Sequence, residues 1–279
     1  MPELPEVETV RATLEPAVVG RRLERVEITD ARLTRPLDPE EVAAELTGEV
    51  VEALERRGKY LVVRFRSGRV LLIHLRMTGS LGHHQPGTLE EDPHRRAVVR
   101  LDDGSDVTYR DVRRFGTWLL LEPGEETAYL TERLGEEPLG EGFTTAVLAA
   151  RFHGRRAPVK AAILDQRAAA GMGNIYADEA LWRARIHPLT PAGQLTRPEL
   201  RRLHRGIKEA LRAGIARQGT TLRDYRRPNG DRGSMQDELR VYGREDEPCP
   251  RCGTAIARTR VAGRGTWYCP TCQPAPPPT

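Results

Sequence analysis

The chain has 279 residues, of which 38% are hydrophobic and 30% are charged, and its formal net charge is +4. It contains no long apolar run of the kind that spans a membrane, and its acidic N-terminus lacks the basic and apolar regions of a signal peptide. We therefore expect a cytoplasmic protein with two domains and a small additional module.

The N-terminal part of the chain is predicted to be a helix-flanked β-sandwich that spans residues 1–121. Apolar residues recur at helical spacing from Leu4 to Val18, and Gly20 stops this first helix. Asp38 and Pro39 open a second, short helix as its N-cap and first helical residue. Seven further stretches have strand-like patterns: residues 23–29, 50–56, 60–65, 70–75, 98–101, 107–109 and 117–121.

The rest of the chain changes to a helical period after an acidic linker rich in Pro and Gly, residues 122–142. We expect an α-helical domain over residues 143–247, and within it a functional loop, residues 219–238, that shows no stable periodicity. Residues 248–273 form a last module, and residues 274–279 form a disordered, Pro-rich tail. The fold class is therefore α+β. The expected helices are residues 145–152, 159–166, 175–185 and 198–218.

Charge is distributed unevenly along the chain. Residues 155–272 contain 23 Lys or Arg against 12 Asp or Glu, whereas residues 1–154 contain 21 against 28. The basic half suits a polyanionic partner, although a solvated charged surface would leave the same pattern. Only three of the 44 basic residues are Lys, namely Lys59, Lys160 and Lys208. Each is a candidate for a role that Arg cannot fill, such as a proton donor or a compact phosphate ligand.

The first residues could supply a nucleophile. Removal of Met1 would leave Pro2 with a secondary amine, and an α-amino group has a pKa near 8, so an appreciable fraction is unprotonated at neutral pH. Glu3 and Glu6 follow closely enough to donate or accept protons. The alternative is a simple helix start, because Pro and acidic residues are both favoured in a first turn.

Four cysteines form the strongest motif. Cys249 and Cys252 are separated by two residues, as are Cys269 and Cys272, and the chain has no other Cys. This spacing predicts one Zn²⁺ with four thiolate ligands. The role of the metal should be structural, because four thiolates leave no open position for a reactive water. Two disulfides or a redox pair are the alternatives. The metal should hold a β-hairpin whose tip contains Arg264.

The opening Pro2-Glu3-Leu4-Pro5-Glu6-Val7-Glu8-Thr9 resembles that of the bacterial formamidopyrimidine-DNA glycosylases, which excise 8-oxoguanine. Leu4 favours this branch over the related endonuclease VIII branch, which usually has Gly there. The resemblance spans residues 2–273 and implies a bifunctional glycosylase and AP lyase. It also implies that Pro2 attacks C1′ as the nucleophile while Glu3 protonates the opening sugar.

The resemblance assigns DNA-contacting roles to several residues of the N-terminal part. The stretch Arg57-Gly58-Lys59-Tyr60 is similar to one in which the Lys binds phosphate and donates a proton, although Lys59 could instead be the nucleophile. Met77, Arg113 and Phe115 resemble residues that fill the void left by an extruded base. His74 and His94 would contact DNA, and Arg96 departs from a family pattern in which many members have His.

The resemblance extends to the basic half of the chain. The stretch 171–180, with Asn174 as a predicted helix cap, is similar to the family's helix-two-turn-helix, in which Lys160 and Asn174 would bind the lesion strand. Arg156 and Tyr242 would extend this track, and Arg264 would contact phosphate and donate a proton in the second elimination. The loop 220–238 matches one that closes over flipped 8-oxoguanine, although Met235 replaces a common aromatic residue.

These observations predict an enzyme that binds double-stranded DNA with oxidised bases, as a monomer, and excises oxidised purines before β,δ-elimination. Two alternatives stay open. One is an endonuclease VIII-like glycosylase for oxidised pyrimidines, and the other is a non-catalytic zinc-ribbon DNA-binding protein.

Overall fold

The computed structural model describes residues 1–221 and 226–276, which form two compact units. The first unit contains Met1–Glu132 and Gln218–Ser234, and the second contains Arg133–Arg217 and Met235–Thr279. The sequence pattern places the loop 219–238 in the helical domain, whereas most of it belongs to the first unit. The reason is long-range backbone bonding: the N–H of Thr220 donates to Glu6, and the N–H of His83 donates to the carbonyl of Pro228.

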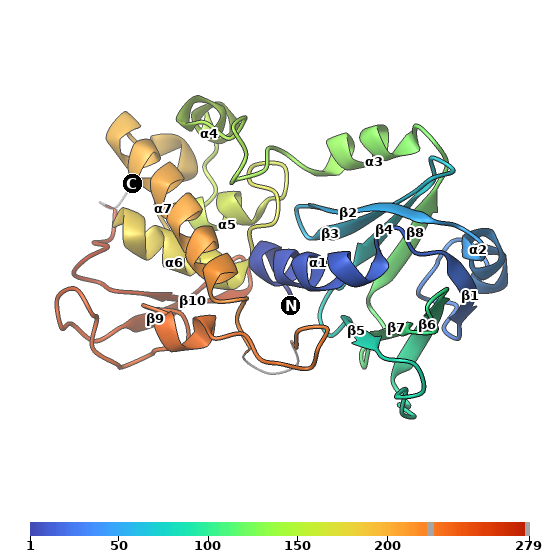
Figure 1. Ribbon diagram of the computed structural model, residues 1–279. Helices are drawn as coiled ribbons and strands as arrows, with labels where there is room; N and C mark the ends of the chain where they lie inside the picture. The colour runs from blue at the N-terminus through green and yellow to red at the C-terminus, as the bar shows by residue number, and fades with distance from the viewer. Residues whose placement is uncertain (222–225, 277–279) are drawn as a thin grey trace. The chain divides into compact units, whose positions relative to one another are not determined.

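The first unit is a sandwich of two antiparallel four-stranded sheets, flanked by helices α1 (Leu4–Val18) and α2 (Pro39–Leu46) (Figure 1). The strand orders are β1-β6-β7-β5 and β2-β3-β4-β8. Apolar side chains from α1, α2 and both sheets form one buried cluster between these layers. The strands are β1 (Leu23–Ile28), β2 (Val51–Arg57), β3 (Tyr60–Phe65), β4 (Val70–His74), β5 (Ser80–His84), β6 (Arg95–Leu101), β7 (Asp106–Arg110) and β8 (Thr117–Leu121).

Strand β5 is the sandwich strand that the sequence pattern misses. Its sequence, Ser-Leu-Gly-His-His, has a single strongly apolar residue and therefore no clear alternation. It forms because all five of its residues pair with β7, from Ser80 opposite Arg110 to His84 opposite Asp106. Pairing with a neighbouring strand, rather than its own propensity, decides the conformation of this segment.

The second unit packs helices against one another and ends in a two-stranded hairpin. Helices α6 (Asn174–Ala184) and α7 (Arg197–Ala216) approach closely at Gly206, where an added Cβ would lie 2.7 Å from the carbonyl oxygen of Ala180. Helix α7 begins with a capping box in which Thr196 and Glu199 exchange hydrogen bonds. The elements are α4 (Thr145–Phe152), α5 (Val159–Leu164), α6 (Asn174–Ala184), η1 (Ala192–Gln194), α7 (Arg197–Ala216), η2 (Met235–Glu238), β9 (Ala257–Val261) and β10 (Arg264–Tyr268).

The α+β class is thus confirmed, with a sandwich, a helical part and a C-terminal hairpin in the order that the sequence indicates. Helix α3 (Glu125–Arg133) lies in the predicted linker. In the described part of the chain, no helix is both long and apolar enough to cross a membrane.

Candidate functional site

The start of helix α1 holds Pro2 and Glu3 in buried positions. Glu3 is the N-cap residue of α1, and its side chain is 3% exposed. The N–H of Glu3 donates to Oε2 of Glu6 at 2.9 Å, and the N–H of Thr220 donates to Oε1 of Glu6 at 2.7 Å. Both carboxyl oxygens of Glu6 therefore accept backbone hydrogen bonds. This geometry does not support the expected proton transfer by Glu6, and it makes Glu6 an anchor between the helix start and the loop that contains Thr220.

Lys59 lies in a tight turn between strands β2 and β3. Arg57 pairs with Tyr60, so Gly58 and Lys59 form a two-residue hairpin turn, and Gly58 has the positive φ of 59° that such a turn requires. Lys59 is only 5% exposed. The sequence around Lys59 contains no sign of this burial, because only the tertiary structure covers the turn. The alternative in which Lys59 is the nucleophile therefore needs a direct test.

His74 ends strand β4 as a buried, neutral imidazole. Its Nδ1 accepts a hydrogen bond from the N–H of Arg76 at 3.0 Å, so Nε2 carries the proton of the neutral ring. Burial, together with the positive charges of Arg76 and Lys59, lowers the pKa of His74 to about 3. At neutral pH this side chain can donate a hydrogen bond to a phosphate but adds no positive charge.

The three residues that resemble void fillers come from two adjacent turns of the first unit. Met77 is 38% exposed and Phe115 is 50% exposed, which is unusual for large apolar side chains. The guanidinium of the exposed Arg113 lies 4.8 Å from the centre of the Phe115 ring. The N–H of Arg113 donates to the hydroxyl of Thr78 at 3.0 Å, so the turn that carries Met77 touches the one that carries Arg113 and Phe115.

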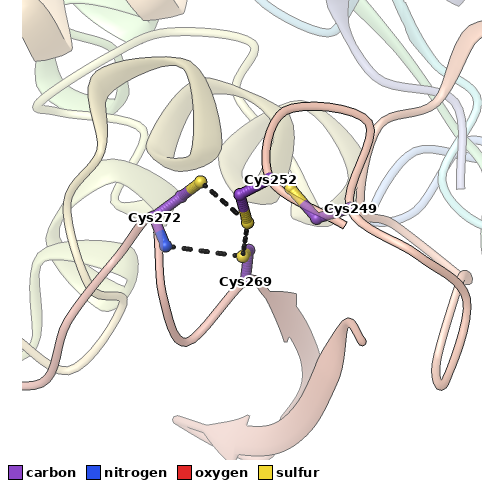
Figure 2. Close-up of side chains that lie close together, drawn as sticks. All are labelled: Cys249, Cys252, Cys269 and Cys272. Carbon is purple, nitrogen blue, oxygen red and sulfur yellow. Dashed lines mark hydrogen bonds between the residues drawn. The ribbon is translucent and has the colours of Figure 1, made fainter. Parts of the chain in front are cut away.

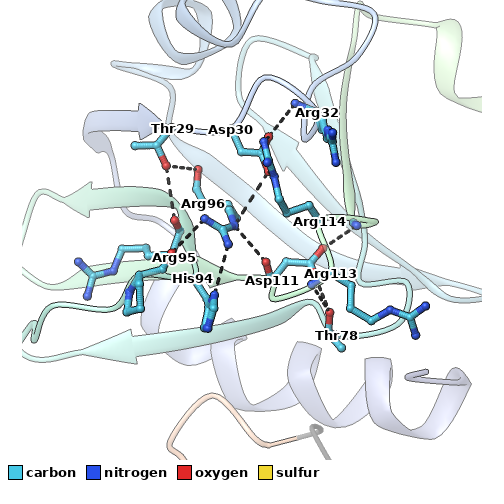
Figure 3. Close-up of polar contacts among 12 residues, drawn as sticks. Thr29, Asp30, Arg32, Thr78, His94, Arg95, Arg96, Asp111, Arg113 and Arg114 are labelled. Carbon is cyan, nitrogen blue, oxygen red and sulfur yellow. Dashed lines mark hydrogen bonds and ion pairs between the residues drawn. The ribbon is translucent and has the colours of Figure 1, made fainter.

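Asp111 fixes the loop that carries Arg113 and Phe115 (Figure 3). Its carboxylate is 1% exposed, and Oδ1 accepts hydrogen bonds from the Thr78 hydroxyl and from the Arg113 N–H. Oδ2 accepts the N–H of Gly116 at 2.7 Å. Sequence reasoning missed Asp111. Its signal is a single acidic residue two positions before Arg113, where a carboxylate can bind the amides of a turn.

Arg96 supports the same region from strand β6. Its Nε donates to the carbonyl of Asp111 at 3.0 Å, and its Nη1 donates to the carbonyl of Pro93 at 3.1 Å (Figure 3). Nη2 of Arg96 lies 3.5 Å from Nδ1 of the half-buried His94. Arg96, which departs from the family pattern, thus holds the backbone at Pro93 and at Asp111 and orients His94.

Asp30, buried to 3% exposure, binds the neighbouring Arg114 through two contacts of 2.6 Å (Figure 3). Arg114 has a φ of 58°, in the left-handed region, so this ion pair stabilises a backbone conformation that Arg rarely adopts. The bonds from Arg114 hold the pKa of Asp30 below its usual value despite the opposing effect of burial.

The four cysteines form a metal site in the second unit (Figure 2). Their Sγ atoms all lie within 4.8 Å of one another, and none forms a disulfide. The indole Nε1 of Trp182 donates to Sγ of Cys249 at 3.4 Å, and the N–H of Cys272 donates to Sγ of Cys269 at 3.4 Å. N–H donors aimed at sulfur suit thiolate ligands, so the donor set fits one structural zinc, as predicted.

The hairpin beside this metal site places Arg264 at the surface. Ala262 and Gly263 form its two-residue turn with φ values of 48° and 75°, and Arg264 is the exposed first residue of β10. The prediction that the tip contains Arg264 is therefore wrong by one residue, because the turn is Ala262-Gly263 and Arg264 directly follows it. The side chain of Arg264 still projects next to the turn.

Lys160 and Asn174 face the hairpin. Lys160 is fully buried, and its Nζ lies 2.9 Å from the carbonyl oxygen of Gly265 and 2.8 Å from Oγ1 of Thr266. Asn174 is the first residue of α6, whereas Gly173 is the N-cap, so the expected capping role of Asn174 is wrong. Its Nδ2 donates to the carbonyl of Gly265 at 3.0 Å. Both side chains bind hairpin backbone in this conformation.

The remaining candidates lie in the second unit and the loop. Arg156 is exposed, and Tyr242 is half-buried with its ring 4.5 Å from that of Trp267. The N–H groups of Arg240, Val241 and Tyr242 all donate to Oε1 of the buried Glu179. Met235 is fully buried and thus serves as a core residue. Residues 222–225 of the expected loop 219–238 lie outside the described residues.

The fold thus consists of a β-sandwich that begins with a buried Pro-Glu helix start, followed by helices and a four-cysteine hairpin. Family models match three segments of the chain. They describe the formamidopyrimidine-DNA glycosylase N-terminal domain over residues 1–118, the H2TH domain of the same enzyme over residues 134–226, and a zinc finger found in FPG and IleRS over residues 246–275. The chain therefore belongs to the formamidopyrimidine-DNA glycosylase family, which confirms the resemblance.

Individual proteins agree with this assignment. The chain is 51% identical to a formamidopyrimidine-DNA glycosylase of Symbiobacterium thermophilum, over 99% of this chain and 90% of that protein. It is 45% identical to one of Bacillus subtilis, over 98% and 99%. A solved structure of MutM (FPG) from Thermus thermophilus is 43% identical with a TM-score of 0.87, covering 99% of this chain and 100% of that one. Lactococcus lactis Fpg bound to abasic-site DNA is 37% identical with a TM-score of 0.91, covering 98% and 100%.

Proposed function

We propose that this chain excises 8-oxoguanine and formamidopyrimidines from double-stranded DNA and then cleaves the strand at the resulting site. Its family membership makes it a DNA glycosylase of base excision repair. The finer substrate assignment is supported by structural relatives that hold DNA with Fapy-dG or with carbocyclic 8-oxo-G. Leu4 supports the same branch. The protein would act in the cytoplasm, as a monomer.

The proposed reaction begins when removal of Met1 frees the secondary amine of Pro2. The unprotonated nitrogen attacks C1′ of the damaged nucleotide, the bond from C1′ to the base breaks, and the departing base takes up the proton that the Pro2 nitrogen loses. Glu3 protonates the ring oxygen of the sugar as the bond from C1′ to that oxygen breaks. The sugar opens to a positively charged iminium ion. This ion acidifies the C2′ proton, so loss of that proton expels the 3′-phosphate, and a second elimination expels the 5′-phosphate.

The proposed DNA contacts have distinct chemical roles. Met77 and Phe115 would fill the void left by the extruded nucleotide, and Arg113 would pair with the orphan base, because all three are exposed on adjacent turns. Lys59 and Arg264 would serve as phosphate ligands and proton donors in the eliminations. The remaining phosphate contacts would come from His74, His94, Arg156 and Tyr242.

The observation that carries this proposal is the burial of Pro2 and Glu3 at the start of α1, where Glu6 binds both the Glu3 and the Thr220 amides. A segment that served only to start a helix would not need the hydrogen bond between Glu6 and Thr220, which lies 214 positions later in the chain. This hydrogen bond joins the start of α1, which carries the candidate nucleophile Pro2, to the first residues of the loop that resembles a lesion-binding loop.

The test is borohydride trapping of the covalent intermediate on an 8-oxoguanine duplex. We expect the wild type to give an adduct, and Pro2→Leu with Met1 retained, as verified by mass spectrometry, to give none. Lys59→Ala should keep the adduct but slow strand cleavage, and Lys208→Ala is the matched control. If Lys59→Ala abolishes the adduct while the blocked N-terminus leaves it intact, Lys59 is the nucleophile.

Substrate preference is tested in the same assay with two duplexes. 8-Oxoguanine opposite cytosine should be cleaved at least roughly tenfold faster than thymine glycol under single-turnover conditions, a difference of about 1.4 kcal/mol in activation free energy. Comparable or reversed rates would assign the chain to the endonuclease VIII-like alternative. Binding without any adduct on either duplex would favour the non-catalytic alternative.

A further inference from the structure

The second unit contains a buried ion pair with no role in the reaction described above. Lys160 in α5 and Asp178 in α6 are each at most 1% exposed, and Nζ of Lys160 lies 2.8 Å from Oδ1 of Asp178. Burying two charges is costly, and an apolar pair of similar volume is often at least as stable. Such a pair therefore calls for an explanation beyond stability.

Both members of this pair bind the strand that follows Arg264. Lys160 contacts the carbonyl of Gly265 and the hydroxyl of Thr266, while Oδ2 of Asp178 accepts the N–H of Trp267 at 3.1 Å. Three consecutive residues of β10 are thus held by one lysine and one carboxylate from two helices. The hydroxyl of Thr266 in turn donates to the carbonyl of Arg264 at 3.1 Å.

The chemistry of Lys suits this position better than that of Arg. A primary ammonium directs three N–H donors from one atom, and three oxygens, from Asp178, Gly265 and Thr266, lie within 2.9 Å of Nζ. The planar guanidinium of Arg is larger and would not converge on three oxygens at a single point. This requirement explains a Lys in a chain in which 41 of the 44 basic residues are Arg.

We propose that Lys160 and Asp178 are positioning residues that fix strand β10 and thereby orient Arg264 toward DNA, and that Lys160 itself does not contact DNA. This inference rests on the proposed function, in which Arg264 binds a phosphate of the lesion strand. It revises the expectation that Lys160 is a phosphate ligand, because the fully buried ammonium is already surrounded by protein oxygens.

Glu179, the next residue of α6, shows that this helix positions a second segment in the same way. Its Oε1 accepts the amides of residues 240–242, and its Oε2 binds Arg183 at 2.9 Å. Adjacent acidic residues of one helix thus hold both the hairpin with Arg264 and the segment with Tyr242. Helix α6 is the common support of two candidate phosphate-contacting residues.

The first experiment requires no DNA. Amide hydrogen exchange of residues 257–268 is measured in the zinc-loaded full-length wild type, in Lys160→Met and in the control Lys208→Met. We expect exchange in the hairpin to rise roughly tenfold or more in Lys160→Met, with stoichiometric zinc retained, and no change in Lys208→Met. Unchanged exchange in Lys160→Met would overturn the proposal.

The second experiment is a double-mutant cycle with a duplex that contains a stable abasic-site analogue. Arg264→Ala should lower the slope of log affinity against log salt by about 0.9 for one lost phosphate contact. Lys160→Met should lower the slope similarly in the wild-type background and have no further effect in the Arg264→Ala background. An additive loss of about 1.8 in the double variant would show that Lys160 binds phosphate directly.

A gentler variant covers the case in which Lys160→Met does not fold. Thr266→Val removes one acceptor of Nζ without leaving an unpaired buried charge, and it should raise hairpin exchange in the same direction but less. Unchanged exchange in a folded Thr266→Val protein would then overturn the proposal. Absence of a borohydride adduct in the wild type would instead refute the proposed function, since exchange and zinc content are independent of catalysis.

Discussion

The loop that carries Arg113 and Phe115 and the hairpin that carries Arg264 both present exposed side chains, but they are held in different ways. The loop is fixed by Asp111, which binds two amides within five residues and the hydroxyl of Thr78. This loop belongs to the unit that contains the large apolar core of the sandwich. The hairpin stands on a much smaller cluster that includes the metal ligands Cys249 and Cys269.

The difference shows which interactions each region depends on. The loop is held by groups that all belong to the sandwich, including Asp111, Arg96 and Asp30, so it should form whenever the sandwich forms. The hairpin depends on zinc and on the buried pair Lys160 and Asp178, because a small cluster alone buries too little apolar surface to fix it. The two regions should therefore respond separately to substitutions.

The largest effect is expected from Cys269→Ser. Loss of one thiolate should leave an incomplete site, so zinc content and affinity for lesion DNA should fall together while the sandwich still unfolds cooperatively. Zinc can be measured by metal analysis and unfolding by calorimetry, with Ser67→Ala as a surface control. Stoichiometric zinc and normal DNA binding in Cys269→Ser would refute the dependence of the hairpin on the metal.

A smaller effect, confined to the first unit, is expected from Asp111→Ala. The amides of Arg113 and Gly116 and the hydroxyl of Thr78 would lose their acceptor, which should lower the free energy of unfolding by about 3 kcal/mol in urea titrations. Excision of 8-oxoguanine should slow more than cleavage at a preformed abasic site, because base extrusion is the step in which Met77, Arg113 and Phe115 are proposed to act.

Zinc content should stay at the wild-type level in Asp111→Ala. The matched control is Asp103→Ala, which also removes a carboxylate that binds a turn. That carboxylate binds Ser105, in a different turn from the one that carries Arg113 and Phe115. Equal slowing of base excision and abasic-site cleavage would contradict a role of Asp111 in orienting the loop.

The smallest effect is expected on the pH dependence of stability, when His74 is replaced in His74→Asn. The folded-state pKa of His74, about 3, lies below the ordinary value of 6.5, so the unfolded chain binds the proton more readily. The contribution of His74 to stability is complete above pH 6.5 and is lost as the pH falls toward 3, by at most about 1.4 kcal/mol per pH unit. His74→Asn, which keeps an acceptor for the Arg76 amide, should show a weaker loss of stability between pH 7.5 and 5.5 in urea titrations. The same pH dependence in both proteins would contradict this assignment.

The salt dependence of DNA binding provides a second check on His74. A neutral imidazole releases no counterion, so His74→Asn should weaken binding without changing the slope of log affinity against log salt, whereas Arg264→Ala should lower the slope by about 0.9. A lower slope in His74→Asn would mean that the ring is charged in the complex.

Local patterns determined much of this protein from the sequence alone. The helical spacing from Leu4 to Val18, the alternation of seven of the eight sandwich strands and the cysteine spacing each depend on residues that are close in the chain, and the structure agrees with them. The Pro-Glu opening and the cysteine motif were also sufficient to indicate the family. These features could be predicted because their physical causes act over a few residues.

Only the tertiary structure decided how the candidate residues are supported. It paired the weakly patterned β5 with β7, buried Lys59 in a turn, and brought Glu6 to the amide of Thr220. It also turned Lys160 away from solvent toward β10, more than a hundred residues later in the chain. Burial and long-range hydrogen bonds depend on which segments meet in space, and no local pattern in the sequence records those meetings.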